Sequence, residues 1–153
     1  MSRLVAGQSV LAICTGNICR SPFAEHYIRT LAEDLGLELG AGSAGTHALV
    51  GYPAPPEAIE AADGMGVDLR AHAARQLTAK MLRSADMVVA MEDMHRELIQ
   101  PLIASLSAGN RPRIEVLEVG DPYLRSREVY RMRYEEIAKR CRELMGDLLG
   151  PGA

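Results

Sequence analysis

Short apolar runs along the chain alternate with stretches in which apolar residues recur at helical spacing. The runs are residues 10–13, residues 87–90 within the predicted strand 86–91, and residues 114–117, where Glu115 is the one charged position; a softer run broken by two glycines covers 37–44. Continuous apolar runs of this length predict strands that are buried on both faces. The pattern therefore predicts four strands.

Helical spacing is clearest near the two ends of the chain. Ser21 followed by Pro22 is a typical helix start, with the serine as N-cap, and Gly36 can end that helix. The apolar positions of this helix are Ala24, Ile28, Leu31 and Leu35. Near the C-terminus, spacings of four and three predict one apolar stripe on a long helix, made of Tyr130, Tyr134, Ile137, Cys141, Leu144 and Leu148.

Two further helices are expected between the predicted strands. A loop with Pro53, Pro55 and Pro56 precedes one of about ten residues around Ile59 and Ala62. The other covers residues 93–106, between the last two strands. Strands that alternate with helices imply parallel pairing, so the fold class is α/β, a single-domain sandwich over residues 1–153.

Composition narrows the possible functions. The chain has 153 residues, with 17 Lys and Arg against 20 Asp and Glu, a formal charge of −3. That balance argues against a nucleic-acid partner, because proteins that bind nucleic acids usually carry a basic surface. Three cysteines do not make a disulfide framework and fit a reducing compartment, so we expect a cytoplasmic protein.

The N-terminal segment allows one alternative. Arg3 and the apolar residues 4–13 resemble a short signal peptide, and residues 11–14 resemble a bacterial lipidation box. The interruption by Gln8 and Ser9 and the weak positive region argue against that interpretation. No apolar run approaches the length of a membrane-spanning helix, so we expect no membrane insertion.

The turn after the first predicted strand carries the candidate chemistry. It reads Cys14-Thr15-Gly16-Asn17-Ile18-Cys19-Arg20-Ser21-Pro22. A loop between a strand and a helix start can curl its N–H groups inward as an anion cradle, to which the helix N-terminus adds. Arg20 supplies two parallel donors suited to phosphate oxygens. In α/β sheets ligands bind at this end of the strands.

Cys14 would lie on the floor of this cradle as a nucleophile. Because the thiolate is the reactive form, the loop N–H groups, Arg20 and the Ser21 hydroxyl must together stabilise the anion. Gly16 and Asn17 tolerate the left-handed backbone that such a loop needs. Cys14 and Cys19 could instead suggest zinc, but histidines at zinc-finger spacing are missing, so we expect no metal.

This loop resembles the signature loop of the low-molecular-weight protein tyrosine phosphatases, specifically the bacterial type encoded with exopolysaccharide export. The similarity extends through Pro22 and Glu25 and spans roughly residues 9–148. Further matching segments are Ser43-Ala44-Gly45-Thr46, Ala48-Leu49-Val50-Gly51, Ala73 with Arg75-Gln76, Ala85-Asp86, Met91-Glu92, Asp121-Pro122-Tyr123 and Ser126-Arg127-Glu128.

The resemblance implies a three-layer sandwich around a four-stranded parallel sheet of order 2-1-3-4. It implies that Cys14 is the nucleophile, that Arg20 binds the phosphate and that Asp121 is the general acid and base. The implied substrate-binding residues are Thr15, Gly16, Asn17, Ile18, Cys19, Ser21, Leu49 and Tyr123. Asn17 and Ser21 would also hold the loop in shape, and His72 would support Asn17. His26, His47 and His95 are assigned to ordinary surface or core positions.

The same resemblance suggests a substrate and a regulation. Protein-arginine phosphatases of the family carry threonine at the position of Ile18, so isoleucine favours phosphotyrosine. Cys19 could trap an oxidised Cys14 as a disulfide, or it could simply pack under the loop. The implied partner is a phosphotyrosine protein, a bacterial tyrosine autokinase; phosphate and other oxyanions would inhibit, and no cofactor is needed.

Two other functions remain as alternatives. A thioredoxin-coupled arsenate reductase would need further redox cysteines, but residues 22–140 contain none. A phosphotyrosine-reading module without turnover would not need Cys14 and Asp121 together. The sequence therefore favours hydrolysis of phosphotyrosine.

Overall fold

The computed structural model describes residues 7–106 and 111–149, the last three by their backbone alone. Its sheet has four parallel strands in the order β2-β1-β3-β4: β1 Ser9–Cys14, β2 Gly40–Gly45, β3 Met87–Ala90 and β4 Arg113–Val116. The helices are α1 Arg20–Asp34, α2 Pro56–Asp63, α3 Ala79–Ser84, α4 Asp93–Ala104 and α5 Arg127–Leu149. The predicted α/β class and strand order are confirmed.

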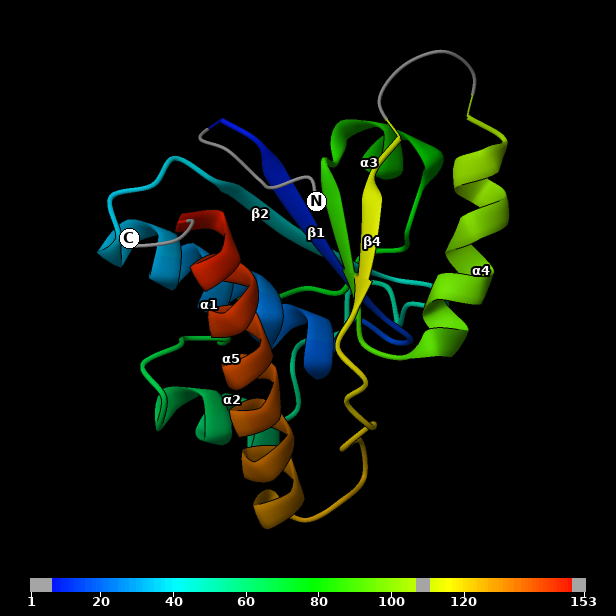
Figure 1. The fold of residues 1–153 in the computed structure, drawn as a ribbon. Coiled ribbons are helices and arrows are strands. Elements are labelled where there is room, and N and C mark those ends of the chain that lie inside the picture. The colour runs from blue at the N-terminus through cyan, green and yellow to red at the C-terminus, as the bar shows by residue number, and fades with distance from the viewer. Residues whose placement is uncertain (1–6, 107–110, 150–153) are drawn as a thin grey trace.

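Two helical layers cover the two faces of the sheet. Figure 1 shows α1, α2 and α5 on one side and α3 and α4 on the other. Side chains alternate accordingly along β1: Val10 and Ala12 pack in the core under α1 and α5, whereas Leu11 and Ile13 pack in the core under α3 and α4. Burial on both faces explains why the two central strands, β1 and β3, read as continuous apolar runs.

The carboxyl ends of the strands meet at one edge. Cys14 ends β1 directly opposite Gly45, the last residue of β2. A Cβ at Gly45 would lie 2.4 Å from the carbonyl oxygen of Thr15, so only glycine lets the two chains approach this closely. The ends of β3 and β4 lie beside these two, because Ala90 pairs with Ile13 and with Val116. The loops that follow all four strands therefore begin at the same edge as Cys14.

The first helix differs from the prediction at its start. It begins at Arg20, and its N-cap is Cys19, which makes no side-chain capping bond. Ser21 was therefore predicted wrongly as the N-cap. Its hydroxyl is engaged by Asn17 and Cys14 instead of by the N–H groups of the first turn.

The end of α1 accounts for a second difference. Gly36 closes the helix with φ +67°, as predicted, and the N–H of Leu37 still bonds the carbonyl of Ala32. Because residue 37 belongs to this helix end, β2 begins only at Gly40. The short helix α3 was not predicted; Thr78 caps it by accepting from the N–H of Met81 at 3.2 Å.

The apolar stripe of α5 is confirmed over most of its length. Tyr130, Tyr134, Ile137 and Cys141 are all buried, and Leu144 packs against the same core. Three parts of the prediction lie outside the described residues: the side chain of Leu148, residues 3–6 of the segment that resembles a signal peptide, and the two ends of the predicted domain. Among the described helices, none is long and apolar enough to cross a membrane.

Candidate active site

Cys14 lies at the floor of a small cavity at the carboxyl edge of the sheet. The cavity has a volume of about 190 Å³ and is lined by Cys14, Thr15, Gly16, Ile18, Cys19, Arg20, His47, Leu49, Asp121 and Tyr123. This is below the range of about 300–1,000 Å³ found for drug-sized ligands. The volume suits a small group, such as a phosphate with one ring.

A serine hydroxyl is directed at the sulfur of Cys14. Ser21 Oγ lies 2.9 Å from Cys14 Sγ and also accepts a hydrogen bond of 2.8 Å from Asn17 Nδ2. Since the amide nitrogen can only donate, the serine hydrogen is left for the sulfur. A donor in this position stabilises the thiolate over the thiol.

Asn17 fixes the shape of the loop through every polar atom of its side chain. Its Nδ2 also donates to Ser43 Oγ at 3.0 Å, and its Oδ1 accepts from the N–H of Arg75 at 2.8 Å. Its backbone carbonyl oxygen lies 2.6 Å from His72 Nε2. Asn17 is fully buried with φ +58°, a conformation that asparagine adopts more readily than most residues. The loop is therefore tied to three other segments of the chain.

Arg20 is buried and only partly paired. Its Nη1 donates to Glu92 Oε1 and to the carbonyl oxygen of Val119. Within the described part of the chain its Nε has no hydrogen-bond partner. Its Nη2 lies 3.8 Å from an Asp121 oxygen, which is beyond hydrogen-bond distance. Nε and Nη2 form one edge of the guanidinium, so this edge is available for two oxygens of an anion.

The backbone of the loop offers further donors. Among the described residues, no group accepts a hydrogen bond from the N–H groups of residues 15–19. The N-terminus of α1 follows at Arg20. Unused N–H groups at a strand–helix turn are the usual basis of anion binding. The loop thus matches the predicted cradle in chemistry and in position.

Asp121 and Tyr123 stand at the rim of the cavity, in the loop after β4. Asp121 Oδ1 accepts from the N–H of Tyr123 at 2.9 Å, which orients the carboxylate, and the other oxygen faces Arg20. Leu49 forms another part of the rim, where its N–H bonds the carbonyl of Gly16 at 3.1 Å. Leu49 and Tyr123 are half exposed, so both offer apolar surface to a ligand that enters the cavity.

Two hydroxyls from α5 hold the far end of the loop. Tyr134 donates to the carbonyl oxygen of Cys19 at 2.6 Å, and Tyr130 Oη lies 3.3 Å from Cys19 Sγ. Burial raises the pKa of the Cys19 thiol to about 12, so this cysteine stays protonated at neutral pH. Cys14 and Cys19 both line the cavity, but their sulfur atoms have different partners: Ser21 Oγ contacts Cys14, and Tyr130 Oη contacts Cys19.

Sequence reasoning missed two residues that contact the loop. Glu92 anchors Arg20, and the buried His95 bonds both Glu92 and Thr15. His95 Nδ1 accepts from the N–H of Glu92, so Nε2 carries the hydrogen and donates to Thr15 Oγ1 at 2.9 Å. Burial, together with the nearby Arg20, lowers the pKa of His95 to about 4. The capping box of Glu92 and His95 at the start of α4 was the available signal, but glutamate and histidine are unusual in that motif.

The structure brings every predicted site residue to one place. Cys14, Arg20 and Asp121 line the cavity with six of the predicted substrate-binding residues, Thr15, Gly16, Ile18, Cys19, Leu49 and Tyr123. Asn17 and Ser21, which were also predicted to bind substrate, do not line the cavity; together with His72 they form the hydrogen bonds behind it. His47, which was assigned to an ordinary position, also lines the cavity.

Comparison with known proteins identifies the family. The family model described as low molecular weight phosphotyrosine protein phosphatase matches residues 9–150. The low molecular weight protein-tyrosine-phosphatase Etp of Escherichia coli strain K12 is 36% identical over 138 residues, which cover 88% of this chain and 90% of Etp.

Two solved structures show the same fold. The tyrosine phosphatase Wzb from Escherichia coli K30, in complex with phosphate, has a TM-score of 0.80 at 30% identity and covers 92% of both chains. The arginine phosphatase YwlE of Bacillus subtilis, as a variant with a phosphorylated active-site serine, has a TM-score of 0.85 at 29% identity. That alignment covers 95% of this chain and 98% of YwlE. The chain therefore belongs to the low-molecular-weight protein tyrosine phosphatase family, as the resemblance of its loop predicted.

Proposed function

We propose that this protein hydrolyses phosphotyrosine on proteins through a phosphocysteine intermediate. One arrangement supports the proposal above all: in the described part of the chain the Nε–Nη2 edge of Arg20 makes no hydrogen bond, and Arg20 shares the cavity with the Cys14 sulfur. A buried cation with two free donors attracts a phosphoryl group, and the sulfur below is a nucleophile for its phosphorus.

In the first step the Cys14 thiolate attacks phosphorus. The S–P bond forms while the P–O bond to the tyrosine ring breaks, and Asp121 donates its proton to the departing phenolate oxygen. The loop N–H groups and Arg20 bind the equatorial oxygens, whose charge must be stabilised in the transition state. The position of Asp121 at the rim suits a group that acts on the ring-bearing oxygen.

In the second step a water molecule attacks the phosphocysteine. Asp121, now ionised, takes the proton of that water, the S–P bond breaks, and inorganic phosphate leaves. The Ser21 hydroxyl stabilises the thiolate as it is released. The chemistry requires neither a metal nor a cofactor, and it requires Cys14 in its reduced form, which supports a cytoplasmic location.

The walls of the cavity support tyrosine as the substrate side chain. Leu49, Tyr123 and Ile18 contribute apolar surface on which a phenyl ring can pack. We further propose that the physiological substrate is a bacterial tyrosine autokinase active in exopolysaccharide production. The support is the sequence resemblance in residues 43–51 to enzymes of that type.

Phosphate release from a phosphotyrosine peptide in the presence of a metal chelator tests the proposal. Wild type should turn over, and Cys14→Ser should lose activity by at least about 100-fold while it still binds phosphate. A phosphoarginine peptide run in parallel decides between the two substrate classes known in the family. Faster release from phosphoarginine would overturn the tyrosine assignment, and binding without turnover would indicate a reading module.

A further inference from the structure

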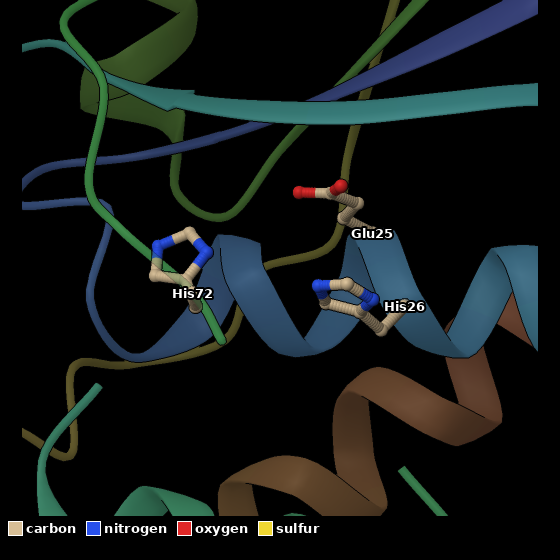
Figure 2. Close-up of side chains that lie close together, drawn as sticks. All are labelled: Glu25, His26 and His72. Carbon is tan, nitrogen blue, oxygen red and sulfur yellow. The ribbon is translucent and has the colours of Figure 1, made fainter. Parts of the chain in front are cut away.

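Glu25, His26 and His72 form a half-buried cluster behind the loop. Their potential ligand atoms all lie within 4.8 Å of one another. Glu25 and His26 come from α1, whereas His72 comes from the segment between α2 and α3 (Figure 2). The cluster borders a cavity of about 380 Å³ that is separate from the active-site cavity. Nothing in the proposed reaction uses this group of side chains.

The hydrogen bonds of His72 leave one ring nitrogen for a ligand. Its Nε2 lies 2.6 Å from the carbonyl oxygen of Asn17, which can only accept, so Nε2 carries the hydrogen. Its Nδ1 therefore has a free lone pair, and Figure 2 shows a nitrogen of this ring turned toward His26. Histidines that bind metals usually donate their other N–H to a carbonyl or carboxylate in this way.

His26 and Glu25 complete a set of three donors. A nitrogen of the His26 ring faces His72, while its Nδ1 makes only a long contact of 3.3 Å with Arg29 Nη1. Because Arg29 can only donate, His26 Nδ1 accepts in this contact and Nε2 carries the hydrogen. Metal binding through Nε2 therefore moves the hydrogen to Nδ1 and breaks the contact, at small cost because Arg29 keeps its bonds to Glu25 and to the carbonyl of Ala41. Each Glu25 oxygen accepts one hydrogen bond and retains a second lone pair.

We propose that Glu25, His26 and His72 bind a divalent transition-metal ion of the Zn²⁺ type. Two imidazoles and one carboxylate, with water in the fourth position, are a common tetrahedral set for zinc. Nitrogen donors disfavour Mg²⁺ and Ca²⁺, which prefer oxygen. Zinc bonds to nitrogen and oxygen are about 2.0–2.2 Å long, and donor atoms that all lie within 4.8 Å of one another are close enough to be reached by one ion.

The bound ion would act on the loop through two hydrogen-bonded connections. His72 contacts the Asn17 carbonyl oxygen, and Glu25 Oε1 accepts from Ser43 Oγ at 2.6 Å, which in turn accepts from Asn17 Nδ2. The ion would thus join α1 to the segment of His72 directly behind Asn17. A ligand that binds only the folded chain raises its stability.

Binding of Co²⁺ and Zn²⁺ to the purified protein tests the site independently of phosphatase activity. The Cys14→Ser variant is the background, because the reactive thiolate is itself a metal ligand. Cys19 and Cys141 are both buried, and a sulfur-to-cobalt charge-transfer band would reveal either of them as a ligand. In this background we expect one equivalent of Co²⁺ with absorption bands of nitrogen and oxygen ligands, and a higher Tm with Zn²⁺.

His26→Ala should weaken Co²⁺ binding at least about tenfold and abolish the rise in Tm, whereas His47→Ala is the matched control and should bind as before. His26→Gln repeats the test with a side chain that keeps polarity if the alanine variant folds poorly. Equal binding by the His26 variants, a sulfur-to-cobalt charge-transfer band, or no saturable binding would each overturn the proposal.

Discussion

The side-chain amide of Asn17 donates to the hydroxyl oxygen of Ser21 over 2.8 Å, and this bond determines where the serine hydrogen points. The only other partner of that hydroxyl among the described residues is Cys14 Sγ. The Cys14 sulfur therefore receives a donor whose direction is set by a third residue. Asn17 and Ser21 thus support the sulfur from behind the loop of residues 14–20.

Ser21→Ala tests the role of this donor. A hydrogen bond to a charged group contributes about 1.5–3 kcal/mol, so turnover should fall roughly 10- to 100-fold. Alkylation of Cys14 by iodoacetate should slow in parallel, because the sulfur loses the donor that stabilises its negative charge. Ser21→Thr keeps a hydroxyl and serves as control. Unchanged alkylation in the alanine variant would show that Ser21 acts only on loop shape.

Glu92→Ala tests how Arg20 is positioned. The variant leaves Arg20 Nη1 with only the Val119 carbonyl as a partner. The guanidinium should then lose its fixed orientation, and kcat/KM should fall about tenfold. Inhibition by inorganic phosphate should weaken by a similar factor, measured as a competitive inhibition constant. Normal phosphate inhibition in this variant would remove Glu92 from the binding machinery.

Asp121→Asn tests whether Asp121 donates the proton to the leaving group. A general acid contributes about 100-fold or more when the leaving group is poor. Release of phenol from phenyl phosphate should therefore slow much more than release of p-nitrophenol. The ratio of the two rates is the measurement, and Asp93→Asn, which lies in α4, is the control. Equal slowing of both substrates would assign the proton to another group.

His95 predicts a dependence of stability on pH. Its folded-state pKa of about 4 lies below the ordinary value of 6.5, so the unfolded chain binds the extra proton first. The contribution of His95 to the free energy of unfolding is therefore fully present above pH 6.5 and is lost as the pH falls toward 4. The loss amounts to about 3 kcal/mol. Urea unfolding from pH 4 to 7 should show this slope in wild type and a smaller slope in His95→Gln.

Cys19→Ser tests the redox hypothesis. A Cys14 sulfenic acid that meets the Cys19 thiol would form a disulfide and release water, which protects Cys14 from further oxidation. Wild type treated with peroxide should then recover activity with dithiothreitol, whereas Cys19→Ser should not. Equal recovery by both proteins would leave Cys19 as a packing residue, for which the Tyr130 contact is sufficient.

The elements that could be predicted are those whose signals are local. The apolar run at β3 and the stripe along α5 depend on neighbouring residues alone, and both elements formed where expected. The fold class followed from their alternation. The start of α1 was predicted wrongly because its serine serves a loop contact, and α3 was missed because six residues carry little periodicity.

The candidate site shows the same limit. Cys14 and Arg20 stand close together in the sequence, and their spacing becomes informative through the strand before it, the Gly16-Asn17 pair inside it and the helix start after it. Glu92 and His95 reach the loop from α4, more than 70 residues away, and histidine and glutamate at a helix start do not indicate what they contact. The Glu25, His26 and His72 cluster was also missed, since its members come from separate segments.

The hydroxyls of Tyr130 and Tyr134 on Cys19 set a constraint on biosynthesis. Residues 14–20 leave the ribosome early, but the two tyrosines that fix the end of this loop are translated more than 100 residues later. The loop cannot take its final form until α5 has emerged and docked. A nascent chain would therefore hold Cys14 without its complete surroundings, and the loop would gain its last two contacts only after translation has passed Tyr134.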